Sequence, residues 1–206
     1  MLKPNRCCVS LSLLLALSLG LAQAQAKPKA ATVKADQPLS APALRALLTP
    51  DTVWCEGWSA TQADCDAVHM SQLQPDGTVL ESSIFQISVR PDVTLRLYDR
   101  ARLENDRICT VFRLADAEME LVMEGQVMPP EAAESFREEM APSTEELEGK
   151  IICQRFVTTS DPDIYTEQVT VAGERRPDLE STFRVYRGNP SLKLRQPPET
   201  PELMDL

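Results

Sequence analysis

Residues 75–99, PDGTVLESSIFQISVRPDVTLRLYD, contain two alternating apolar patterns separated by a turn signal at residues 90–92. The apolar residues that recur at every second position are Phe85, Ile87 and Val89 in the first pattern and Val93, Leu95 and Leu97 in the second. Because successive side chains of a strand point to opposite faces, this spacing predicts two strands with one buried face. The turn signal at residues 75–77 joins them to a preceding strand, so we expect a sheet rich in hairpins.

Similar strands lie on both sides of this stretch. We expect them at residues 68–74, 108–114 and 118–124, and then at residues 150–159, 163–173 and 181–188. The segment 118–124 also suits a helix, because Met, Leu and Glu are good helix formers, and we assign it to a strand. Most connections are too short for parallel crossovers. The predicted fold class is mainly β, at the margin of α+β: an antiparallel sheet or partly closed barrel of about eight strands with one acidic helical insertion.

The helical insertion is predicted at residues 129–149, where β-branched residues nearly vanish and Ala and Glu take over. Pro129 and Pro130 suit a helix start, whereas Pro142 should break the helix before a last turn that ends at Gly149. Seven glutamates against a single arginine between residues 131 and 148 make this segment very acidic. We expect a solvated helix face, and the alternative is a docking face for a cationic partner.

The first 26 residues have the parts of a secretory signal peptide: a basic end, an apolar run and small residues at a cleavage site. We expect cleavage after Ala24 or Ala26 and a protein that is periplasmic or secreted. Cys7 and Cys8 precede the apolar run and would leave with the leader. The run is too short for a comfortable membrane span, so no stable membrane insertion is predicted.

Four cysteines remain in the exported chain: Cys55, Cys65, Cys109 and Cys153. An even number in an oxidising compartment favours disulfides, and three pairings are possible. The short segment between Cys55 and Cys65 closes easily into a loop, so we expect these two to pair and to leave Cys109 for Cys153. Zinc is the alternative, but the cysteine spacing and a single histidine do not suit it, and no metal site is predicted.

Composition also predicts the boundaries of the domain. Residues 27–50 are rich in Ala and Pro, which indicates a linker with a short helix. Ser40 can cap this helix, and its apolar face would pack on the domain. The residues of that face are Leu44, Leu47 and Leu48. A single β-rich domain is expected over residues 51–190, followed by a Pro-rich flexible tail at residues 191–206.

The net charge disfavours one class of partner. The chain carries 21 Lys and Arg against 31 Asp and Glu, and loss of the leader shifts the net charge from −10 to −12. Long-range repulsion argues against nucleic acid and anionic lipid. Basic residues on the middle and last strands are explained by intramolecular compensation of the acidic insertion. The alternative is a polar surface for another envelope or secreted protein.

Two tryptophans and one histidine are the remaining candidates for a site. Trp54 and Trp58 lie at the predicted opening loop, where we expect them to cover an end of the sheet or barrel; the alternative is a ligand-binding role. His69 is the only histidine and lacks a diagnostic motif, so no catalytic residue and no cofactor are predicted. We expect a non-catalytic binding or envelope-associated protein. The alternatives are a carrier of small apolar ligands with a lipocalin-like barrel and, third, a hydrolase.

Overall fold

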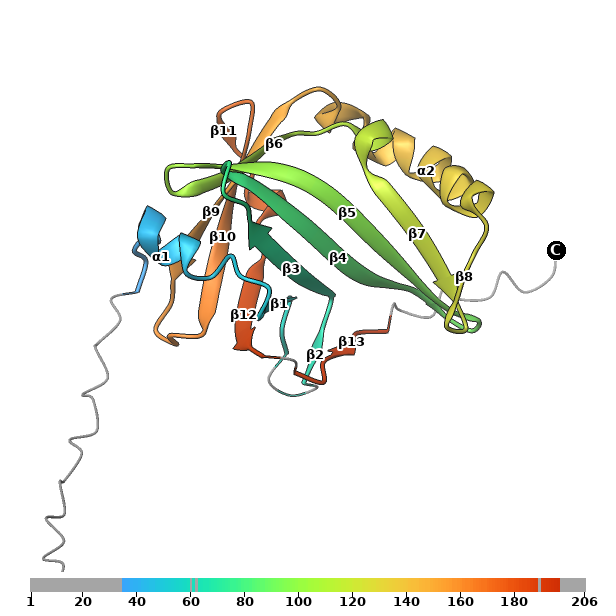
Figure 1. Ribbon diagram of the computed structural model, residues 1–206, viewed down its shortest axis with the longest axis horizontal. Coiled ribbons are helices and arrows are strands. Elements are labelled where there is room, and N and C mark those ends of the chain that lie inside the picture. The colour runs from blue at the N-terminus through green and yellow to red at the C-terminus, as the bar shows by residue number, and fades with distance from the viewer. Residues whose placement is uncertain (1–34, 60, 62, 189, 197–206) are drawn as a thin grey trace, which may run out of the picture. The chain divides into compact units, whose positions relative to one another are not determined.

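The hairpin predicted at residues 75–99 dominates the sheet in the computed structural model, which describes residues 35–59, 61, 63–188 and 190–196. Its strands, β4 (Thr78–Val89) and β5 (Asp92–Glu104), run side by side in a long curve (Figure 1). Phe85 pairs with Leu95, so the apolar positions of the two strands share one face.

Eight antiparallel strands close into a barrel. The ring order is β4-β3-β1-β12-β10-β9-β6-β5, and β5 pairs with β4 to complete the circle. The other ring strands are β1 (Thr52–Glu56), β3 (Ala67–Leu73), β6 (Arg107–Val111), β9 (Ile151–Thr158), β10 (Ile164–Val171) and β12 (Thr182–Arg187). The predicted mainly β, antiparallel class is therefore confirmed, and the sheet is a closed barrel.

One of the eight predicted strands lies outside the ring. Residues 118–124 form a strand, β7 (Glu118–Met123), but β7 branches from β5 and pairs with the short β8 (Gln126–Val127). The ring is completed instead by β1, which the sequence analysis wrongly assigned to an opening loop. The first four residues of β1 are all buried, so β1 lacks the alternation by which a half-buried strand is recognised.

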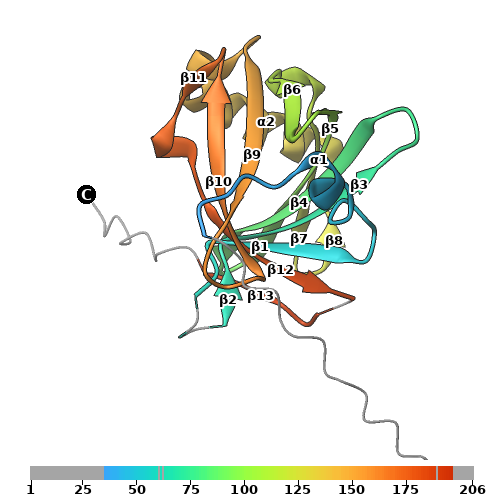
Figure 2. The ribbon, with the colours of Figure 1, turned by 90° about the vertical axis from the view of Figure 1, so that its left-hand side faces the viewer.

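A short helical segment before β1 closes one end of the barrel. α1 (Ala41–Arg45) begins after Ser40, whose hydroxyl accepts a hydrogen bond from the amide of Ala43, as predicted. α1 lies between the β9–β10 side and the β3–β4 side of the barrel (Figure 2). The buried residues that this segment adds to the core are Leu39, Leu44, Leu47 and Leu48.

The acidic insertion forms α2 (Pro130–Thr144), which lies along β7 beside the barrel (Figure 1). Ala133, Phe136 and Met140 pack against apolar residues of β4, β5 and β7, and all the glutamates of the insertion are exposed. The predicted break at Pro142 was wrong, because the helix continues to Thr144 and is followed by a 3-10 turn at Glu145–Leu147. Pro142 lies in the last turn of α2, where the loss of one amide donor interrupts little of the helix.

The β-rich domain extends beyond the predicted boundaries at residues 51 and 190. Pro38 pairs with Val157 of β9 on the N-terminal side. On the C-terminal side, β13 (Lys193–Leu194) pairs in parallel with β2 (Asp64–Cys65), so strand pairing reaches into the first residues of the predicted tail. The predicted signal peptide, the linker up to residue 34 and the tail from residue 197 lie outside the described residues. The remaining short elements are β11 (Glu174–Arg175) and two 3-10 turns at Leu114–Asp116 and Pro177–Leu179.

Two disulfides fasten the strands together. Cys55 of β1 bonds Cys65 of β2, and Cys109 of β6 bonds Cys153 of β9, which are the pairs expected from the cysteine spacing. Cys109 and Cys153 face each other across neighbouring strands, so their bond joins the ring strands before α2 to those after it. Two disulfides in a β-barrel domain indicate an extracellular or exported protein.

Candidate functional site

A cavity of about 280 Å³ lies inside the barrel. On β4 its lining residues Glu81 and Ser83 lie between Val79, which belongs to the core closed by α1, and Phe85, which belongs to the core packed on α2. The polar residues of β4 therefore lie between two apolar clusters, and residues of the first cluster, among them Trp54 and Phe156, also line the cavity. Its titratable lining residues are Glu56, His69, Glu81 and Glu167.

Each of these carboxyl groups lies on a strand of the ring and lines the cavity. Glu56 follows Trp54 by two residues on β1, and Glu81 follows Val79 by two on β4. Glu167 is buried on β10 in the same alternate row as Val169. None of the three glutamates was predicted as a site residue: Glu81 and Glu167 interrupt the apolar rows of their strands, whereas Glu56 lies on β1, whose sequence has no alternation. An acidic residue within an otherwise apolar row is the sequence signal that could have identified Glu81 and Glu167.

His69 links the polar groups of three strands in one hydrogen-bonded chain. Its Nδ1 lies 2.7 Å from Oγ of Ser83, and its Nε2 lies 2.8 Å from Oε2 of Glu56. The hydroxyl of Ser181 donates to the other oxygen of Glu56 at 2.5 Å. Burial acts to raise the pKa of Glu56, but the hydrogen bonds from His69 and Ser181 outweigh it and hold this pKa below its usual range. Glu56 is therefore a paired carboxylate.

Glu167 has no comparable partner. Only 4% of the residue is exposed, and its Oε1 is buried without a hydrogen-bond partner among the described residues. Burial raises the pKa of Glu167 to about 8, and the charges of Glu56, Glu81 and Glu180 act in the same direction. This carboxyl group is therefore mostly protonated at neutral pH.

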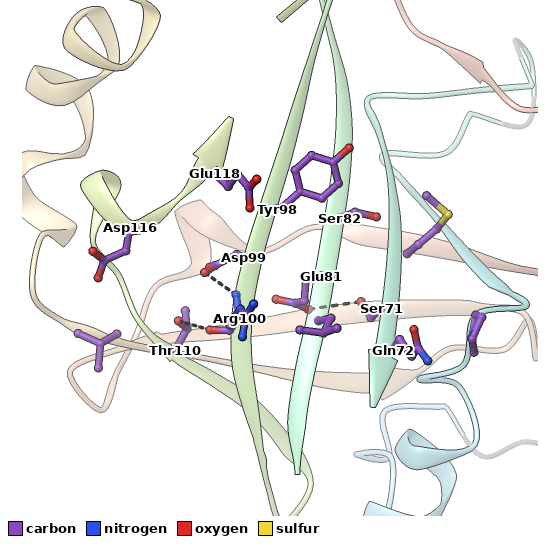
Figure 3. Close-up of a pocket in the computed structure, with 14 residues that line it drawn as sticks. Ser71, Gln72, Glu81, Ser82, Tyr98, Asp99, Arg100, Thr110, Asp116 and Glu118 are labelled. Carbon is purple, nitrogen blue, oxygen red and sulfur yellow. Dashed lines mark hydrogen bonds between the residues drawn. The ribbon is translucent and has the colours of Figure 1, made fainter. Parts of the chain in front are cut away.

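Glu81 lies where the interior cavity adjoins a second cavity of about 600 Å³ along β3, β4 and β5. Ser71 and Glu81 line both cavities and face each other from β3 and β4, with the Ser71 hydroxyl 3.4 Å from Oε1 of Glu81 (Figure 3). Burial, followed by the charge of Asp99, raises the pKa of Glu81 to about 7. Part of the Glu81 population is therefore neutral at physiological pH.

The second cavity has a mixed wall. Figure 3 shows acidic side chains on it, among them Asp116 and Glu118, together with the ring of Tyr98. Exposed Met70 and Leu80 also line it. None of its lining residues carries a buried unpartnered side-chain atom within the described structure, whereas two residues of the interior cavity do. We therefore place the candidate site in the interior.

Aromatic rings form one wall of the interior cavity. The ring of Trp54 lies 4.7 Å from that of Phe156 and 6.2 Å from that of Phe183, measured between centroids. Trp54 is 3% exposed, and its Nε1 has no hydrogen-bond partner among the described residues. Trp54 is thus both a core residue and a lining residue of the cavity.

The two tryptophans considered together from the sequence are separated in the structure. Trp54 lines the interior cavity, whereas Trp58 is not among its lining residues. The guanidinium of Arg184 lies 4.3 Å from the ring centroid of Trp58, which is a cation–π contact. The sequence spacing could not show this, because Trp54 belongs to a strand and Trp58 follows the strand's end.

Comparisons with protein-family models, with curated proteins and with solved structures find no match for this chain. Within the described residues, no three His, Cys, Asp or Glu side chains are grouped so that they could hold a metal ion. No helix in this part of the chain is long and apolar enough to span a membrane.

Proposed function

We propose that the protein is an exported, non-catalytic binding protein, periplasmic or secreted, that holds a small polar molecule inside its barrel. One observation carries this proposal: two residues that line the same cavity, Trp54 and Glu167, each have a buried polar side-chain atom, Nε1 and Oε1, without a hydrogen-bond partner among the described residues. A buried polar group without a partner costs about 1–3 kcal/mol. A molecule that forms hydrogen bonds with these atoms recovers that free energy, which favours its binding.

An apolar ligand suits the cavity less well. Glu56, Glu81 and Glu167 all line a space of about 280 Å³. A hydrocarbon in this space would keep water from the carboxyl groups and give them no hydrogen bond in return. The carrier of small apolar ligands therefore ranks below a carrier of polar ones.

A hydrolase is the second candidate, because Ser83, His69 and Glu56 form a hydrogen-bonded series of nucleophile, base and acid. The surroundings of Ser83 do not favour it. Ser83 lies inside β4 and is paired with His69 on one side and with Leu97 of β5 on the other. The amides around it belong to the sheet and are not free to stabilise an oxyanion, which such chemistry requires.

The proposal is tested by filling the cavity. Val169 is buried and lines the cavity, whereas Gln168 is its neighbour on β10 and faces the opposite side. A set of small cationic, neutral and anionic compounds is screened by thermal shift and native mass spectrometry. Wild-type protein and the control Gln168→Phe should bind at least one of these compounds with a stoichiometry of one. Val169→Phe should lose that binding while remaining folded. If no compound binds the wild-type protein, or if Val169→Phe binds equally well, the proposal is wrong.

A further inference from the structure

Building on the proposed function, we propose that the ligand is a small organic ammonium ion whose charged nitrogen binds the carboxyl group of Glu167. The proposed binding site is the interior cavity. Three features of this cavity favour such an ion: the charge of the wall, the unpartnered oxygen of Glu167, and the aromatic rings nearby.

The charge of the cavity wall favours a cation. Three glutamates and His69 line the cavity, and no lysine or arginine does. His69 lies 2.8 Å from Glu56 and serves as its partner, whereas neither Glu81 nor Glu167 forms an ion pair with a basic side chain among the described residues. A buried carboxylate needs a countercharge or must take up a proton. An anionic ligand would add repulsion, and a neutral one would supply no countercharge.

The aromatic wall suits an organic cation. Trp54, Phe156 and Phe183 line the cavity together, and the centroids of Phe156 and Phe183 are 5.7 Å apart. Ring faces attract ammonium groups, and the attraction grows when water is excluded. The same rings pack against the apolar part of an amine. A metal ion is disfavoured, since the described carboxyl groups and His69 are not grouped to ligate one.

The size of the cavity limits the ligand. At roughly 30 Å³ for each water-sized group, a volume of about 280 Å³ holds about nine such groups. Phenethylamine is of this size and carries both an ammonium group and a ring. Phenethyl alcohol and phenylacetate have nearly the same shape with neutral and negative groups, so the three compounds form a series matched in shape and different in charge.

Binding of an ammonium ion should release a proton. Glu167 is faced by Glu56 from β1, by Glu81 from β4 and by Glu180 from the segment before β12, and burial with these charges raises its pKa to about 8. The neutral carboxyl group therefore gives its proton to solvent when the ammonium ion arrives, and the complex contains an ammonium–carboxylate pair. A neutral ligand has no such effect. Proton release thus reports on the charge of the bound molecule.

The test is calorimetry at pH 7 in two buffers that differ in their enthalpy of protonation. We expect wild-type protein to bind one phenethylamine with release of close to one proton, at least tenfold more tightly than either matched compound. A hydrogen bond to a charged group has this effect on affinity, roughly tenfold or more. Glu167→Gln should weaken amine binding at least tenfold and abolish proton release. Glu174→Gln is the control, because Glu174 is exposed on β11.

The outcomes separate this inference from the proposed function. If phenethyl alcohol or phenylacetate binds as tightly as the amine, or if only neutral or anionic compounds of the wider set bind, the ammonium inference is overturned and the binding function stands. Unchanged amine affinity or proton release in Glu167→Gln also overturns it. Binding only by cations, with sensitivity to Glu167→Gln, supports it. If nothing binds, both proposals fail.

Discussion

Glu167→Gln should change the way in which the stability of the ligand-free protein depends on pH. Glu167 is 4% exposed on β10, and its Oε1 is unpartnered among the described residues. Gln has nearly the same shape and does not titrate. The substitution therefore removes the ionisation of this carboxyl group while preserving most of the packing around it.

The magnitude follows from the two pKa values of Glu167, 4.5 for an ordinary glutamate and about 8 in the folded protein. Below pH 4.5 the carboxyl group of Glu167 is protonated in the folded and in the unfolded protein. Its ionisation then contributes nothing to the difference in unfolding free energy between wild type and variant. As the pH rises towards 8, only the unfolded chain loses the proton, which favours unfolding of the wild type. At about 1.36 kcal/mol per pKa unit, the variant gains about 3 kcal/mol relative to wild type by pH 7 and about 5 above pH 8.

Urea unfolding between pH 4 and pH 9, followed by tryptophan fluorescence, measures this difference directly. Other titrating groups are common to both proteins and largely cancel when the two unfolding free energies are subtracted. Glu174→Gln should show a flat difference, because Glu174 is exposed. A difference between Glu167→Gln and wild type that changes by less than about 1 kcal/mol from pH 4 to pH 9 would refute the buried, unpaired state of Glu167.

Three further predictions concern the barrel and its interior. Replacing both Cys109 and Cys153 by Ala should lower the free energy of unfolding by about 4 kcal/mol, because the bond closes a loop with a sequence separation of 44; a loss under about 1 kcal/mol in urea unfolding would contradict this. A fluorophosphonate probe should label the wild-type protein no more than Ser83→Ala, and specific labelling of Ser83 detected by peptide mass spectrometry would place the hydrolase first. Leu44→Ala should cost about 2–5 kcal/mol, since Leu44 is 0% exposed, whereas Arg45→Ala on the exposed side of α1 should change thermal stability little. Equal melting temperatures for the two variants would show that α1 does not close the barrel.

The alternation of apolar residues was sufficient to predict most of the strands. In β4 and β5 the period of two is a local property, because it depends only on successive side chains pointing to opposite faces. The four cysteines were paired as the structure has them, since loop length alone favours Cys55 with Cys65. The positions of these strands and the pairing of the cysteines thus follow from short-range features of the sequence.

β1 and the closure of the barrel could not be predicted in this way. β1 is buried at four successive positions, so its sequence shows no alternation. Its membership in the ring depends on pairing with β12, where Thr52 meets Arg187 from the far end of the chain. No local pattern specifies a contact over such a distance.

The candidate site likewise depends on contacts between residues that are far apart in the sequence. The sequence contains 31 acidic residues, and only their places in alternating rows distinguish Glu81 and Glu167 from the rest. Nothing in the sequence distinguishes Glu56, because β1 has no such row. Ring closure brings β1, β4 and β10 around one cavity, and burial there changes the pKa of each glutamate according to its partners. The sequence by itself determined the alternating strands and the pairing of the cysteines, because alternation is a local property and loop length favours the pairing of Cys55 with Cys65. Only the tertiary structure decided which carboxyl groups lose water and lack a partner, because desolvation depends on every strand that surrounds them.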